Sequence, residues 1–250
     1  MSANSSKKTT GKQHARHVGQ VVAVTLWVIA SFFLAAVVTI GALFVLGKLG
    51  FSLDSFDQAV QTTVTAGVMY LIAFVITVGV PKIILKHQTS LKEIGLDRLP
   101  SWLDILVGPL GFIPYIILSV LLAYIATLLI PGFDIEEAQD VGFNTVTNQV
   151  GVMLAFVTLV VIAPIAEEAM FRGYLYSKLR RLTGVIWATL LTSLVFGLVH
   201  LQLNVAVDVF ALSLVMCALR EVTGSIWAGV LLHMTKNGLA FFLLFVYPML

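Results

Sequence analysis

Ionisable side chains interrupt the apolar second half of this sequence, where such residues are expensive. They are Glu167, Glu168, Arg172, His200, Asp208, His233 and Lys236, and Asn204 and Asn237 accompany them. An ionisable group at the centre of a bilayer costs roughly 2.5–3.5 kcal/mol, so it persists where it faces a protein interior or a wet cavity. A carboxylate in such a low-dielectric pocket can serve as a general base, so these residues are candidates for a functional site.

The spacing of these residues separates the two adjacent glutamates. Glu168 and Arg172 are four residues apart with the acid first, the favourable order for an ion pair on one helical face. Glu167 points about 100° away and has no such partner in its helix. His233 and Asn237 are also four residues apart, so both can reach into one space.

The depth of these residues also agrees between helices. With about 1.5 Å of rise per residue, Glu167, His200 and His233 each lie roughly 20–22 Å along their helices from the end predicted to be cytoplasmic. Three helices therefore bring a carboxylate and two imidazoles to one level, which predicts a single buried site.

The elements that must position this site are transmembrane helices. Hydrophobic residues make up 59% of the chain and charged residues only 11%, whereas about a quarter of a soluble domain is charged. We predict an all-α, polytopic transmembrane helix bundle with a polar site inside it, formed by residues 21–250 after a disordered basic tail, residues 1–20. The predicted spans are 21–47, 64–81, 104–130, 150–175, 185–200, 205–219 and 224–247.

The charges of the connections predict the orientation. Lys and Arg are concentrated in the tail and in the second and fourth connections, while the third, residues 131–149, is acidic and lacks both. The positive-inside rule then places the N-terminus in the cytoplasm, and we expect an integral protein of a bacterial cytoplasmic membrane. The net charge of +2 gives no reason to expect a nucleic-acid partner. The single cysteine, Cys217, is interpreted as a packing residue.

Three motifs on successive apolar helices carry a family resemblance. They are Glu167-Glu168-Ala-Met-Phe-Arg172, Phe196-Gly-Leu-Val-His200 and His233-Met-Thr-Lys-Asn237. In this order they resemble the CPBP family of intramembrane proteases, also called the CAAX protease and bacteriocin-processing or Abi family, over residues 90–245. The resemblance implies a hydrolase in which Glu167 with His200 activates water and His233 with Asn237 holds the oxyanion. It also implies that Glu168 and Arg172 support the site as a structural pair.

A metal site is the alternative chemistry. Glu167, His200 and His233 could form a set of two histidines and one glutamate with an open fourth position, which suits catalytic zinc, and the family is often called metalloprotease. However, the His-Glu-x-x-His motif of common zinc proteases is absent. We therefore favour a mechanism without a cofactor and keep zinc as the alternative.

Other readings stay open for individual residues and for the whole chain. Asn204 could orient His200 or pair with Asp208, and Lys236 beside Asn237 has no assigned role. A break at Pro164 could open backbone groups toward the site. A proton-coupled transporter would also place such groups in a membrane, but no internal repeat is visible. A catalytically silent immunity or scaffold protein is the third class. The expected partners are a membrane-associated peptide or protein substrate and the bilayer, with substrate and oligomeric state left open.

Overall fold

The computed structural model describes residues 3–84, 89–137, 139, 142–143, 146 and 148–247, and side chains from residue 16 onward. Every regular element in this part of the chain is a helix, and four segments, labelled η, have the wider turns of a π-helix. The first half comprises α1 (Ala3–Lys48), α2 (Gln58–Phe74), η1 (Val75–Gly79), α3 (Val80–Ile84), α4 (Leu91–Ile94), α5 (Trp102–Leu110) and α6 (Phe112–Leu129). The second half comprises α7 (Gln149–Phe156), η2 (Val157–Ile162), α8 (Ala163–Glu168), η3 (Ala169–Leu175), α9 (Tyr176–Thr183), α10 (Val185–Leu198), α11 (Leu203–Thr223), α12 (Trp227–Phe241) and η4 (Phe242–Val246).

The helices confirm the predicted class, an all-helical membrane bundle. Five segments are long and apolar enough to cross a bilayer: Arg16–Lys48, Gln58–Ile84, Trp102–Leu129, Gln149–Thr183 and Trp227–Val246. The other two predicted spans are also helices, but α10 is a shorter apolar helix of 14 residues, about 21 Å long. By itself, α10 is therefore too short to cross a hydrocarbon core about 30 Å thick.

Helical backbone begins earlier than we predicted. The helix α1 starts at Ala3 and so includes residues that we predicted to be a disordered tail. Residues 16–20 continue the helix of the apolar span, but their side chains are exposed and do not bury a face against the rest of the protein. Parts of the acidic third connection, at residues 138, 140–141, 144–145 and 147, lie outside the described residues.

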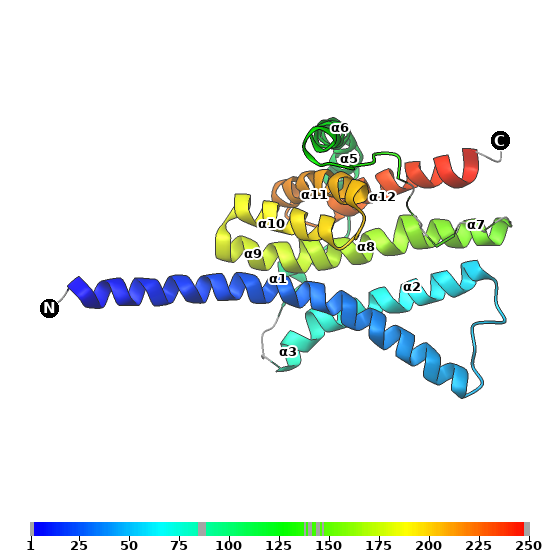
Figure 1. Cartoon of the computed structure of the whole chain (residues 1–250), viewed down its shortest axis with the longest axis horizontal. Helices are drawn as coiled ribbons and strands as arrows, with labels where there is room; N and C mark the ends of the chain where they lie inside the picture. Colours follow the sequence, from blue (N-terminus) through cyan, green and yellow to red (C-terminus); the bar gives the residue numbers. More distant parts are fainter. Residues whose placement is uncertain are drawn as a thin grey trace.

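The helices form layers around one long central element (Figure 1). The segments α7, η2, α8, η3 and α9 follow one another without a break from residue 149 to 183. The helices α1 and α2 pack on one side of this element, and α10 and α12 pack on the other. The helices α5 and α6 then cover α11 and α12. The described ends of the chain lie at opposite ends of the molecule, as an odd number of spans requires.

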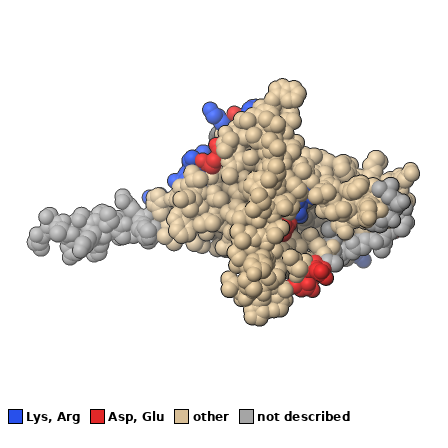
Figure 2. All heavy atoms as spheres, turned by 90° about the horizontal axis from the view of Figure 1, so that it is seen from above, with Lys and Arg blue, Asp and Glu red and all other residues tan. Residues whose placement is uncertain are grey.

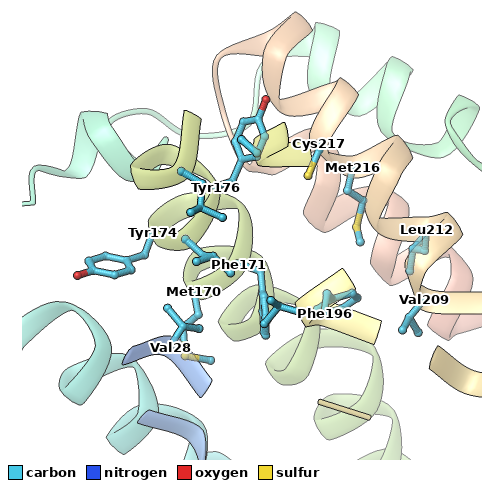
Figure 3. Packing of buried hydrophobic residues seen from close by; sticks show 14 of the residues in the cluster. Val28, Met170, Phe171, Tyr174, Tyr176, Phe196, Val209, Leu212, Met216 and Cys217 are labelled. Atoms are coloured by element: carbon cyan, nitrogen blue, oxygen red, sulfur yellow. The ribbon is translucent and has the colours of Figure 1, made fainter. Parts of the chain in front are cut away.

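Large apolar side chains pack around the turns that follow Glu168. Met170, Phe171, Phe196 and Met216, from η3, α10 and α11, are all fully buried (Figure 3). Outside this core, many Leu, Ile, Val and Phe side chains are exposed, and charged side chains gather mainly toward the edges of the face in Figure 2. Such a surface is suited to lipid and not to water.

The start of α12 is fixed against α5 by polar contacts. Ser101 and Asp104 form a capping box at the N-terminus of α5, and the Asp104 carboxylate also pairs with Arg98. The Trp227 indole N–H donates to the Arg98 carbonyl over 2.7 Å. A Cβ on Gly108 would lie 2.8 Å from the Leu231 Cβ, so only glycine lets α5 approach α12 this closely. These contacts set the position of the helix that carries His233.

Candidate active site

The short helix α8 carries both glutamates and lies between two π-helical segments. In η2 the hydrogen bonds run five residues back, as from the Ala163 N–H to the Thr158 carbonyl. The next donor would be residue 164, but proline has no N–H to give to the Leu159 carbonyl. The Asn237 side-chain amide donates to that carbonyl instead, over 2.9 Å. The opening predicted at the proline thus anchors Asn237, whose second N–H can still face the site.

Glu168 and Arg172 form the predicted ion pair. An Arg172 Nη1–H donates to Glu168 Oε1 over 2.8 Å, and both side chains are fully buried. The guanidinium also lies 4.2 Å from the centroid of the Phe196 ring, a cation–π contact. A Cβ on Gly229 of α12 would lie 2.8 Å from Glu168 Oε2, so α12 approaches the carboxylate at a glycine.

The imidazole of His233 lies between the two glutamates. Its Nε2 is 3.9 Å from Glu167 Oε2, and its Nδ1 is 3.4 Å from Glu168 Oε1. The side chain of His233 is only 5% exposed and that of Glu167 13%. The sequence assigned Glu168 to Arg172 alone, but the structure also brings it to His233. The Nδ1 atom of His233 makes no hydrogen bond within the described residues, so Glu168 faces the imidazole as a nearby carboxylate and not as a hydrogen-bonded partner.

Tyr70 of α2 is a site contact that our sequence analysis missed. Its hydroxyl donates to Glu167 Oε1 over 2.6 Å, across 97 residues of sequence. A tyrosine in an apolar stretch carries no spacing signal that links it to a distant glutamate, so the motifs could not have revealed it.

His200 reaches the site through Phe196. It lies just beyond the C-terminal end of α10, and its Nδ1 is 2.7 Å from the Phe196 carbonyl. Since a carbonyl only accepts, Nδ1 carries the hydrogen, and Nε2 is left as the acceptor in the neutral ring. The Phe196 ring packs edge-on against both imidazoles, with centroid distances of 5.1 Å to His200 and 6.0 Å to His233. No hydrogen bond or ion pair joins His200 to Glu167 in the part of the chain that the structure describes.

Lys236 and Asp208 form a separate polar cluster. Lys236 Nζ lies 3.4 Å from Asp208 Oδ2, while Tyr115 and Ser119 each donate to Asp208 Oδ1 over 2.6 Å. Lys236 therefore pairs with Asp208, although its neighbour in sequence, Asn237, belongs to the candidate site. The Asn204 amide donates to a backbone carbonyl of the third connection over 2.8 Å, so the two roles considered for Asn204 are not seen.

The fit of a metal to these residues can be judged from their side chains. Among the described residues, no three His, Cys, Asp or Glu side chains lie close enough together to hold a metal ion. Glu167 and His233 lie 3.9 Å apart, but together with His200 they do not form a zinc ligand set as arranged in the described part of the chain.

Comparisons with known proteins agree with the motifs. Residues 149–239 match the family model of the Rce1-like type II CAAX prenyl endopeptidases, and this segment contains all three motifs. The resemblance predicted from those motifs is therefore confirmed for this segment. No solved structure matches the chain.

Two curated proteins are each similar to about a third of the chain. "Putative membrane peptidase YdiL" of Bacillus subtilis (strain 168) is 29% identical over 86 residues, which are 34% of this chain and 35% of that protein. An "Uncharacterized 24.3 kDa protein" of Escherichia coli is 35% identical over 97 residues, which are 36% of this chain and 45% of that protein. The chain thus spans less than half the length of each of these relatives.

Proposed function

We propose that this chain is an intramembrane endopeptidase that hydrolyses a peptide bond of a membrane-associated protein or peptide. The observation that carries the proposal is the His233 imidazole, which lies between the carboxylates of Glu167 and Glu168 in a buried part of a helical membrane bundle. The names of the matched family and of the Bacillus subtilis relative point to the same activity.

Glu167 is the general base of the proposed reaction. Its Oε2 takes a proton from water, and the resulting hydroxide adds to the carbonyl carbon of the peptide bond. The Nε2 lone pair of His200 can accept a hydrogen bond from the same water and so orient it. Glu167 then gives its proton to the peptide nitrogen as the C–N bond breaks, which releases the amine and the new carboxylic acid and leaves Glu167 ready for another water.

His233 and Asn237 stabilise the oxyanion in this scheme. The Nδ1 atom of the His233 ring faces Glu168, and Nε2, whose N–H can donate to the oxyanion, faces Glu167. The second N–H of the Asn237 amide is the other donor.

The mechanism needs only these side chains, and no step passes through a metal. We further propose that the N-terminus is cytoplasmic, because the basic connections alternate with the acidic ones. The family name makes a prenylated protein the first substrate class to test, and a bacteriocin-like or leader peptide the second.

Comparative proteomics of host membranes tests the proposal. The wild type should generate new peptide termini that are absent with Glu167→Gln, which keeps the shape of the side chain but removes the base. Glu136→Gln is the matched control, because Glu136 is exposed in the third connection and has no role in the proposed reaction; this variant should cleave like the wild type. Identical peptide termini from the wild type and Glu167→Gln would refute the proposed activity. Counterflow uptake by the protein in liposomes, without cleavage, would favour the transporter alternative.

A further inference from the structure

We infer that Tyr70 is a positioning residue for the general base, so that helix α2 completes the catalytic site. This inference rests on the proposed function of Glu167. It concerns a part of the chain outside residues 149–239, the segment that matches the protease family. The direct observation is the 2.6 Å hydrogen bond from the Tyr70 hydroxyl to Glu167 Oε1.

The direction of Tyr70 is fixed by the way α2 packs on the central helix. Thr63 and Thr77 lie seven residues before and after it, so the three side chains share one helical face. The Thr158 hydroxyl donates to the Thr63 hydroxyl over 3.0 Å, and the Thr77 hydroxyl contacts the Met170 sulfur at 3.8 Å. Three polar contacts thus follow one line between the two helices, and the phenol is the middle one.

The order of these three contacts along the two helices agrees with the predicted topology. The partners of Thr63, Tyr70 and Thr77 on the central helix are residues 158, 167 and 170, so both helices run in the same direction. The second and fourth spans of an alternating bundle must do so. The tyrosine contact therefore follows from the packing of two whole helices and not from one side-chain conformation.

The consequence for catalysis concerns the two oxygens of one carboxylate. With Oε1 held by the phenol, the carboxylate cannot turn freely about its last torsion, and Oε2 remains directed toward His233 Nε2 at 3.9 Å. An oxygen atom about 2.7 Å from both of these atoms fits between them. Tyr70 therefore determines which oxygen of Glu167 faces the reacting water.

Tyr115 provides a matched control elsewhere in the bundle. Its hydroxyl also donates to a carboxylate over 2.6 Å, but the acceptor is Asp208, which pairs with Lys236 and not with the site. Tyr70→Phe and Tyr115→Phe thus remove the same kind of hydrogen bond, one at the base and one away from it. A merely structural role predicts the same behaviour for both variants.

The test combines a spectroscopic and a kinetic measurement on purified full-length protein. The infrared carboxylate band of Glu167 is isolated as the difference between the wild type and Glu167→Gln. It should shift in Tyr70→Phe and stay unchanged in Tyr115→Phe. With a quenched peptide built on a cleavage site mapped by proteomics, kcat per folded molecule should fall about 10–100-fold in Tyr70→Phe at nearly constant KM, the effect of losing one orienting hydrogen bond to a charged group.

The outcomes separate this inference from the proposed function. An unchanged band in Tyr70→Phe would show that the hydrogen bond is absent, and wild-type kcat in that variant would show that it does not position the base. Either result overturns the inference while Glu167→Gln stays inactive. Activity of Glu167→Gln would instead overturn the proposed function itself.

Discussion

Replacing Glu168 by glutamine tests the division of labour between the two glutamates. The glutamine side chain has nearly the same shape, and its oxygen can still accept a hydrogen bond, but it has no charge. Arg172 would then keep its positive charge in a fully buried position without its anionic partner. We expect the folded state to be destabilised strongly, whereas Glu167→Gln should be stable, because its amide oxygen can still accept from Tyr70.

The size of the effect follows from the surroundings of the guanidinium. Arg172 is 0% exposed, and its Nε and Nη2 have no hydrogen-bond partner in the part of the chain that the structure describes, so Glu168 is its main support. Breaking a buried pair by removing one partner costs about 3–5 kcal/mol. For a chain of 250 residues this corresponds to a fall in Tm on the order of 10 °C.

The assay can use the one cysteine of the chain. Cys217 is fully buried, so a thiol-reactive dye reports unfolding in detergent. We expect the Tm of Glu168→Gln to fall as stated and its activity to fall with the folded fraction. Glu168→Gln combined with Arg172→Met removes both charges and should recover more than half of the lost Tm. The reasoning is wrong if Glu168→Gln unfolds within about 2 °C of the wild type, or if the double variant loses the sum of both single losses.

Three further predictions address packing, metal dependence and topology. Gly229→Ala places a Cβ 2.8 Å from Glu168 Oε2 and should lower Tm by several degrees, while Gly238→Ala, with its nearest contact at 3.7 Å, should be tolerated in the same thermal assay. Purified protein should keep its peptidase activity in EDTA or phenanthroline, and loss of activity that zinc specifically restores would make the histidines metal ligands. In a Cys217→Ser background, a cysteine at Glu137 should react with a membrane-impermeant reagent in intact cells, and reaction only after lysis would reverse the orientation.

The fold class could be predicted from the sequence because lipid as the solvent leaves few alternatives. A backbone inside a bilayer must satisfy its own hydrogen bonds, so long apolar segments become helices. All seven predicted spans are helical, although only five meet the length and hydropathy of a span by themselves. The π-helical turns were not predictable, since a change from four-residue to five-residue hydrogen bonding leaves the apolar pattern nearly unchanged.

The site was predictable where its contacts follow helical spacing and not where they cross between distant helices. The pair Glu168–Arg172 follows directly from four-residue spacing. The contact of His233 with Glu168 and that of Tyr70 with Glu167 depend on how separate helices pack, which spacing within one helix does not determine. Likewise, the sequence could not reveal that Lys236 pairs with an aspartate on α11.

One stripe on α12 nevertheless connects the spacing with the packing. Gly229, His233 and Asn237 are four and eight residues apart, so they share one face over about 12 Å of helix. Their contacts run backward along the central helix: Gly229 meets Glu168, His233 lies between the glutamates, and Asn237 binds the Leu159 carbonyl.

The helix α12 and the central helix are therefore antiparallel. The order of their contacts explains the residue type at each position on α12. The glycine admits the closest approach of the two helices. One turn further, the imidazole presents one nitrogen to each of two side chains that diverge from neighbouring positions, Glu167 and Glu168. Two turns further, the amide takes the carbonyl that the proline leaves without a donor. Moving either glutamate by one residue would turn it about 100° around the helix axis, away from the nitrogen that it faces here.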